Sequence, residues 1–140
     1  MQHSTNATGT ILGLDVGARR IGLARASYAA RLAAPFGTLE NNAETLDRLR
    51  AICQQEQVRQ LVIGLPRGLD GQETAQTLTV RAFGALLGNA LGLPIHWQDE
   101  ALTSVQAEAE LEARGKSYQK GDIDSLAAVY ILEDYLHENL

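Results

Sequence analysis

Three carboxylates stand at places in the sequence from which they could act together on a metal ion. Asp15 ends an apolar segment, Glu100 follows another, and Asp124 lies near the start of a C-terminal helical segment. A charge at the end of a buried strand is costly unless it is paired or metal-bound. Taken singly, each carboxylate could equally be an ordinary turn, surface or helix-terminal residue. If the three meet, they form an oxygen-only site that suits Mg²⁺ or Mn²⁺, and two such ions can promote phosphodiester hydrolysis.

The segments that carry these residues predict an α/β fold with a mixed five-stranded sheet flanked by helices. Apolar runs bounded by turn residues predict strands at residues 10–15, 20–24, 33–38, 60–64 and 94–98. The first two strands are close enough in sequence to form a hairpin, with Asp15 near its tip. Strands and helices alternate after this antiparallel start, which indicates a mixed sheet covered by helices.

Two helices are expected before the last strand. Residues 41–44 (Asn-Asn-Ala-Glu) open the first, which places Leu46, Leu49 and Cys53 on one face. The second is expected to end at Gly92. Its apolar face is predicted at positions with helical spacing: Ala75, Leu78, Ala82, Leu86 and Ala90.

Two more helices are expected after the last strand. The first of them starts at Thr103 and ends near Arg114. The C-terminal helix is expected to be capped by Asp122. Its predicted apolar side consists of Ile123, Ala127, Tyr130 and Ile131.

Length, charge and cysteine usage limit the classes of protein that fit. A chain of 140 residues suits one domain, expected at residues 9–140, after a disordered tail at residues 1–8. The net charge of −5 argues against non-specific coating of nucleic acid but leaves room for a local basic patch. Cys53 is the only cysteine, so no intramolecular disulfide or multi-cysteine zinc site can form. With no apolar run of membrane-spanning length and no signal-peptide pattern, a cytoplasmic protein is expected.

Four segments, taken in order, resemble the motifs of the YqgF family. They are residues 12–24 (with Asp15, Gly17, Arg20 and Gly22), 63–71, 98–104 and 120–128. The family comprises bacterial proteins described as candidate pre-16S rRNA nucleases and as Holliday junction resolvase-like proteins. The similarity extends from about Thr10 to the C-terminus. It implies an RNase H-like fold with a two-metal site, whose catalytic, metal-binding carboxylates correspond to Asp15, Glu100 and Asp124.

Two positions depart from the family pattern. Ala101 stands where the family usually has an arginine, and Ala18 stands where a hydroxyl residue is common. The missing guanidinium would weaken phosphate binding or the stabilisation of charge in the transition state. The resemblance therefore supports the metal ligands more strongly than it supports full catalytic strength.

Basic residues near the motif-bearing loops are candidates for contacts with nucleic-acid phosphates. They are Arg19, Arg20, Arg67, Arg81, Lys116 and Lys120, each of which could equally be a solvated surface residue. Arg20 and Arg81 are favoured because the corresponding family positions are often basic. Asp99, beside Glu100, is expected either to support the metal ligands from behind or to be an exposed acid.

The expected function is a metal-dependent nuclease that matures the ends of pre-16S rRNA. One alternative is a Holliday junction resolvase, which needs two active sites related by a two-fold axis and hence a homodimer. A second alternative, motivated by Ala18 and Ala101, is a catalytically weak RNA-binding factor in ribosome assembly. An actin-like ATPase or sugar kinase is disfavoured because 140 residues leave no room for a second lobe.

Overall fold

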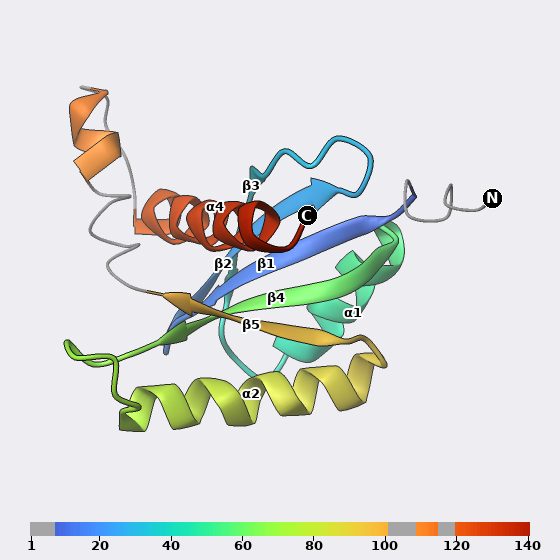
Figure 1. Ribbon diagram of the computed structural model, residues 1–140. Helices are drawn as coiled ribbons and strands as arrows, with labels where there is room; N and C mark the ends of the chain where they lie inside the picture. The colour runs from blue at the N-terminus through green and yellow to red at the C-terminus, as the bar shows by residue number, and fades with distance from the viewer. Residues whose placement is uncertain (1–7, 101–108, 115–119) are drawn as a thin grey trace.

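The computed structural model describes residues 8–100, 109–114 and 120–140. A five-stranded sheet in the order β3-β2-β1-β4-β5 forms its centre. Helix α4 lies on one face of this sheet, and helices α1 and α2 lie on the other (Figure 1). The structure thus confirms the predicted mixed sheet flanked by helices.

The strands follow the expected order, and their ends lie within about three residues of the expected limits. They are β1 (Thr10–Val16), β2 (Arg20–Ser27), β3 (Ala34–Glu40), β4 (Val58–Pro66) and β5 (Ile95–Glu100). β1, β2 and β3 pair antiparallel, whereas β4 is parallel to β1 and β5 is parallel to β4. Parallel pairing brings the carboxyl ends of β1, β4 and β5 to one edge of the sheet, which we call the carboxyl edge.

Alternation of side chains along the strands separates two apolar layers. Leu12 and Leu14 of β1 face α1 and α2, where they join a core that includes Leu87. Ile11 faces α4, where it joins a core that includes Ile131 and Leu132. Odd-numbered positions of β1 therefore point toward α4, and Asp15 is one of them.

Helix α1 (Thr45–Gln55) buries Leu49 and Cys53 as expected, with Leu46 partly buried beside them. The Asn42 side chain accepts a hydrogen bond from the Glu44 backbone amide at 2.9 Å and so shapes the turn before the helix. Burial raises the pKa of the Cys53 thiol to about 11. Cys53 is thus a core residue, consistent with its apolar surroundings.

The predicted apolar face of helix α2 (Ala75–Leu91) is wrong. Leu78 and Leu86 are 61% and 57% exposed, and Ala75, Ala82 and Ala90 are exposed with them. The buried face instead consists of Thr77, Val80, Gly84 and Leu87. Gly84 explains this choice, because a Cβ atom there would lie 2.3 Å from the Trp97 ring. Helix α2 therefore turns Gly84 toward Trp97 of β5, and Leu78 and Leu86 are left exposed on the other side of the helix.

Helix α4 (Lys120–Asn139) begins two residues earlier than the expected cap, so Asp122 lies in its first turn. Ala127 and Ile131 are buried as predicted, whereas Ile123 and Tyr130 are only partly buried. Residues 109–113 are helical, but most of the helix expected from Thr103 lies outside the described residues, as do residues 1–7 of the expected tail. Within the described ranges, none of the helices combines the length and apolar character needed to cross a membrane.

Candidate active site

Asp15, Glu100 and Asp124 come to the same face of the sheet at its carboxyl edge. Asp15 is the sixth residue of β1 and points toward α4, from which Asp124 approaches. Glu100 ends β5, where it pairs with Pro66 of β4. Two residues before it, Gln98 also faces α4, because its amide donates to Glu138 at 3.2 Å. The alternation along β5 therefore puts Glu100 on the α4 face as well.

Two glycines let these carboxylates approach one another. Gly22 lies opposite Asp15 in β2, and a Cβ atom there would lie 2.0 Å from the backbone oxygen of Asp124. A Cβ atom on Gly64 would lie 2.9 Å from Oε2 of Glu100. Glycine at both positions allows helix α4 and the Glu100 side chain to lie directly against the sheet.

The electrostatics of the site are those of a crowded acidic pair. The pKa of Asp15 is raised to about 8, mainly by burial, then by the charge of Glu100, a hydrogen bond with Glu100 and the charge of Asp124. A carboxyl with such a pKa holds a proton at neutral pH. Like charges this close need either that proton or a bound cation.

Asp124 is held by Arg20 in the present structure. Nε of Arg20 lies 2.6 Å from Oδ2 of Asp124, in a pair that is only partly exposed. Among residues 8–100, 109–114 and 120–140, no three acidic, histidine or cysteine side chains are arranged closely enough to hold a metal ion as they stand. The structure therefore brings Asp15 and Glu100 together, with Asp124 near them but paired to a guanidinium.

The donor set nevertheless fits a hard divalent cation. Three carboxylates supply oxygen ligands alone, which is the chemistry that Mg²⁺ and Mn²⁺ prefer. Burial and the charges of Glu100 and Asp124 raise the pKa of Asp15, so a positive ion beside it would favour its ionised form. A cation could replace the proton of that pair.

The candidate phosphate-binding residues divide into three groups. Arg19 and Arg20 line a depression of about 390 Å³ at the β1–β2 turn, together with Gly17, Ala18 and Asp124. Arg67 and Arg81 lie on the opposite face of the sheet at the same edge. Lys116 and the side chain of Lys120 lie outside the described residues, as does Ala101.

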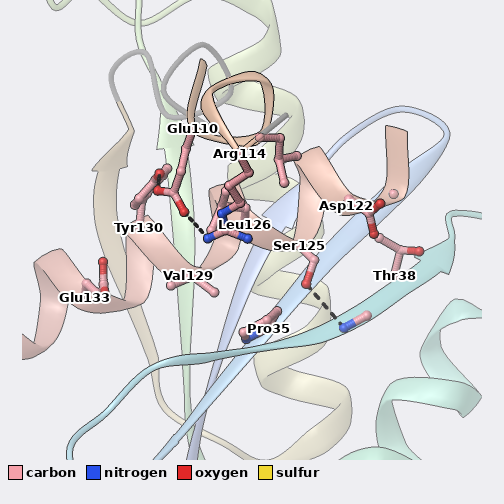
Figure 2. A pocket seen from close by; sticks show the side chains of 13 residues that line it. Pro35, Thr38, Glu110, Arg114, Asp122, Ser125, Leu126, Val129, Tyr130 and Glu133 are labelled. Carbon is pink, nitrogen blue, oxygen red and sulfur yellow. Dashed lines mark hydrogen bonds and ion pairs between the residues drawn. The ribbon is translucent and has the colours of Figure 1, made fainter. Parts of the chain in front are cut away.

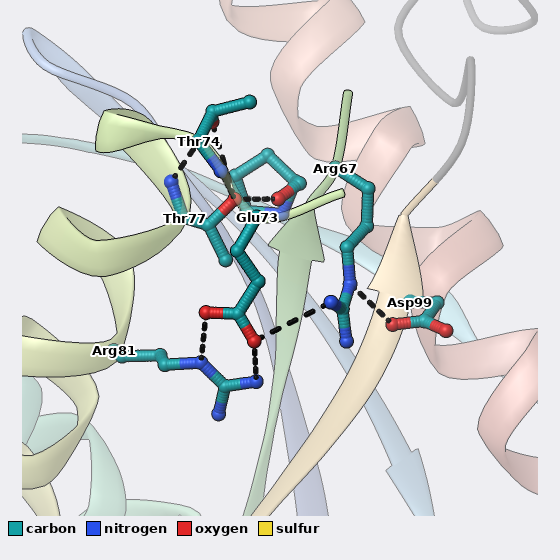
Figure 3. Close-up of polar contacts among 7 residues, drawn as sticks. Arg67, Glu73, Thr74, Thr77, Arg81 and Asp99 are labelled. Carbon is teal, nitrogen blue, oxygen red and sulfur yellow. Dashed lines mark hydrogen bonds and ion pairs between the residues drawn. The ribbon is translucent and has the colours of Figure 1, made fainter. Parts of the chain in front are cut away.

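Arg67, Arg81 and Asp99 belong to one network of ion pairs, centred on Glu73 (Figure 3). Asp99 is exposed and accepts a hydrogen bond from Nε of Arg67 at 3.2 Å. Its side chain therefore lies on the face of the sheet opposite to that of Glu100. Sequence reasoning considered the two arginines separately and missed Glu73, which carries no motif signal of its own.

A cavity of about 730 Å³ is lined by residues of β3, the helical segment at 109–114 and α4 (Figure 2). Tyr130 donates a hydrogen bond to Glu110 at its rim. The Ser125 hydroxyl donates to the Leu23 backbone oxygen at 3.0 Å and accepts from the Gly37 amide at 3.3 Å. These contacts hold α4 to β2 and β3, and none of the three candidate carboxylates lines the cavity.

The sequence of this chain is similar to those of known proteins over most of its length. A family model described as "RuvX: Holliday junction resolvase" matches residues 9–138. A candidate pre-16S rRNA nuclease of Thermosynechococcus vestitus is 40% identical over 131 residues, which cover 91% of this chain and 87% of that protein. A protein of the same name from Lactococcus lactis subsp. cremoris is 36% identical over 132 residues, covering 90% and 92%.

Solved structures show the same fold. RuvC of Thermus thermophilus, in complex with a Holliday junction substrate, superposes with a TM-score of 0.56 at 15% sequence identity. The superposition covers 93% of this chain and 94% of that one. At this identity the likeness concerns the fold alone, and it confirms the RNase H-like architecture expected from the sequence.

Proposed function

Because the chain belongs to the RuvX Holliday junction resolvase family and is therefore a nuclease, we propose that it cuts phosphodiester bonds with divalent metal at Asp15, Glu100 and Asp124. The observation that carries this proposal is the half-buried Asp15–Glu100 pair, with the Asp15 pKa raised to about 8 beside Asp124. Perturbed carboxylates at one edge of a sheet are typical of functional sites. We expect Asp15, Glu100 and Asp124 to be the ligands of Mg²⁺ or Mn²⁺.

When bound, a pair of such ions supplies an activated water and stabilises the leaving oxygen. The chain contributes the ligands and their spacing, which Gly22 and Gly64 set. Arg20 has a second role in this proposal. Its guanidinium donates to Oδ2 of Asp124 at 2.6 Å and neutralises that carboxylate. With Asp124 serving as a metal ligand, Arg20 and the neighbouring Arg19 would be available to bind a phosphate of the substrate.

We propose the ends of pre-16S rRNA as the substrate, because this is the task for which the curated relatives are named. A cytoplasmic location follows from that task. Holliday junction resolution is the second candidate, favoured by the family description and by the RuvC fold. It requires a homodimer, so that two active sites cut symmetrically. A weakly catalytic RNA-binding factor is the third, because Ala18 offers no hydroxyl at the β1–β2 turn.

The test is a side-by-side cleavage assay on an RNA carrying the pre-16S ends and on a four-way DNA junction. We expect Mn²⁺ or Mg²⁺ to support cleavage of the RNA and a chelator to abolish it. Asp15→Asn, Glu100→Gln and Asp124→Asn should each lower the rate by about 100-fold or more. Asp47→Asn is the control, since this exposed carboxylate lies on α1.

Each result of this assay has a definite meaning. Full activity in all three variants would exclude the carboxylate site. Cleavage of the junction alone, by a dimeric protein, would favour the resolvase. RNA binding in chelator, with no cleavage after metal is added, would favour the assembly factor.

A further inference from the structure

Glu73 occupies the space between two guanidinium groups at the carboxyl edge (Figure 3). Its Oε2 lies 2.8 Å from Nη2 of Arg81 and 3.4 Å from Nη1 of Arg67, and its Oε1 lies 3.2 Å from Nε of Arg81. We infer that Arg67 and Arg81 form a phosphate-binding site for the nucleic acid, in which the Glu73 carboxylate stands where a phosphate binds. This inference rests on the proposed nuclease function.

The geometry is that of an oxyanion site. The two-point contact with Arg81 is the parallel arrangement by which guanidinium binds carboxylate and phosphate alike. The hydrogen bond from Arg81 lowers the pKa of Glu73, so the occupant is an anion at neutral pH. Glu73 also directly precedes Thr74, the N-cap of the 17-residue helix α2, whose dipole favours negative charge. The guanidiniums of Arg67 and Arg81 and the positive end of the α2 dipole thus all lie close to the Glu73 carboxylate.

Both arginines are held by contacts that do not involve Glu73. The Arg81 guanidinium lies 5.7 Å from the centre of the Trp97 ring. Nε of Arg67 is bonded to Asp99. These contacts keep the two guanidiniums in place when the carboxylate turns away, so that an incoming phosphate finds a formed site.

The position of the site suits a phosphate at a distance from the cut bond. Arg67 follows Pro66, the register partner of Glu100, and Asp99 directly precedes Glu100. The arginine pair and the candidate carboxylates therefore occupy opposite faces of one edge. The side chains of Glu73 and Arg81 are 38% and 36% exposed, so solvent and a ligand can reach them. A nucleic acid passing over this edge can contact both sites, and Glu73 competes with it for the arginines.

The first test detects the site without any nucleic acid. In the Glu73→Gln variant, the Nε–H signals of Arg67 and Arg81 should shift when inorganic pyrophosphate is titrated in an NMR experiment. In the wild type the same shifts should need about threefold to tenfold more pyrophosphate, because the carboxylate competes. Unchanged arginine signals in Glu73→Gln, or equal midpoints in the two proteins, would overturn the inference.

The second test measures the affinity for a fluorescent RNA in chelator, where cleavage cannot occur. Glu73→Gln should tighten binding about threefold to tenfold at low salt. Glu56→Gln is the matched control, because it also removes one carboxylate paired with an arginine, Arg25, at the opposite edge of the sheet. In an Arg67→Gln/Arg81→Gln background, Glu73→Gln should no longer tighten binding.

The outcomes separate this inference from the proposed function. Equal effects of Glu73→Gln and Glu56→Gln would show a general charge effect and overturn the inference. A gain that persists without the two arginines would overturn it too, and so would weaker binding by Glu73→Gln. Pyrophosphate binding at Arg67 and Arg81 without any RNA binding or cleavage would contradict the proposed function and leave the anion site standing.

Discussion

At the scale of single residues, Asp15 shows how the fold keeps a carboxylate ready for a cation. Its half-buried side chain lies beside Glu100 and Asp124, and the desolvation and the two charges raise its pKa to about 8. In the unfolded chain the pKa of the same group is near its ordinary value of 3.8. Between these two values the folded state holds a proton that the unfolded state has released. Folding is therefore penalised more and more as the pH rises through this window.

Replacing Asp15 with Asn should remove this penalty. In metal-free buffer, Asp15→Asn should gain stability relative to wild type as the pH rises from 5 to 8. The gain should reach roughly 2–4 kcal/mol, since one pKa unit is worth about 1.4 kcal/mol and the Asp15–Glu100 pair shares part of the effect. Thermal or urea unfolding at several pH values measures the difference.

The same measurement carries its own control. Asp47→Asn removes a carboxylate whose side chain is 84% exposed, so its difference from wild type should not grow with pH. Saturating Mn²⁺ should reverse the order of stability at pH 8, because only the wild type keeps all three ligands. A gain in Asp15→Asn that is constant from pH 5 to 8 would contradict the raised pKa.

At the scale of elements, the distance between α4 and the hairpin β1–β2 decides whether the carboxylates can meet. Gly22 sets this distance, because its Cα faces the backbone of Asp124 with no room for a side chain. Ser125, the next residue of α4, fastens the helix to β2 by donating to the Leu23 carbonyl. The helix is thus positioned by backbone contacts at the point where the candidate ligand leaves it.

Gly22→Ala should move α4 away from the sheet. A Cβ atom 2.0 Å from a backbone oxygen cannot be accommodated without a shift, so we expect a loss of about 2 kcal/mol in stability. The rate of cleavage should fall about tenfold to 100-fold at temperatures where the variant remains folded, since small displacements of ligands are costly. Circular dichroism melts and the cleavage assay measure the two effects separately.

Leu87→Ala provides the comparison for Gly22→Ala. This fully buried leucine of α2 lies in the other core, so its loss should cost about 2–5 kcal/mol without displacing the carboxylates. Its cleavage rate below the melting temperature should stay close to that of the wild type. Wild-type activity in Gly22→Ala would show that the approach of α4 does not govern the site.

An element can be predicted from the sequence when the residues that determine it are close together in the chain. The strand that delivers Asp15 is a nearly continuous apolar run, and the strand that delivers Glu100 alternates apolar and polar residues, so their order and limits follow from the sequence within a few residues. The buried face of α2 does not follow from the sequence, because apolar residues lie on two sides of this helix. Gly84 against Trp97 decides between the sides, and that contact joins two elements whose pairing no local pattern specifies. The contacts of Glu73 with Arg67 and Arg81 could not be predicted either, because the conformation of the loop after β4 brings these residues together.

At the scale of the whole molecule, an acidic protein must bind a polyanion through a restricted surface. The net charge is −5, and Arg25, Arg48, Arg50 and Arg114 each pair with a carboxylate. At the edge itself, Arg19 and Arg20 lie on one face, and Arg67 and Arg81 on the other. Binding should therefore involve few phosphates, in contrast to proteins that coat nucleic acid with a broad basic surface.

The salt dependence of RNA binding tests this restriction. Each neutralised phosphate contributes about 0.7–0.9 to the slope of log Kd against log salt. The four arginines at the edge predict a slope of about three, and counting the sequence candidates Lys116 and Lys120 as well raises it to about five. Fluorescence anisotropy in chelator between 50 and 300 mM KCl, about the range in which such slopes are resolved, gives the value.

Single variants then assign the slope to the edge. Arg20→Gln and Arg81→Gln should each reduce it by about one, whereas Arg31→Gln, in the turn between β2 and β3 at the opposite edge, should leave it unchanged. A slope near ten would require phosphate contacts far beyond the four edge arginines and would contradict a binding surface confined to this edge. A wild-type slope of about three to five that falls by the same amount in Arg20→Gln, Arg81→Gln and Arg31→Gln would show that these arginines act through net charge alone.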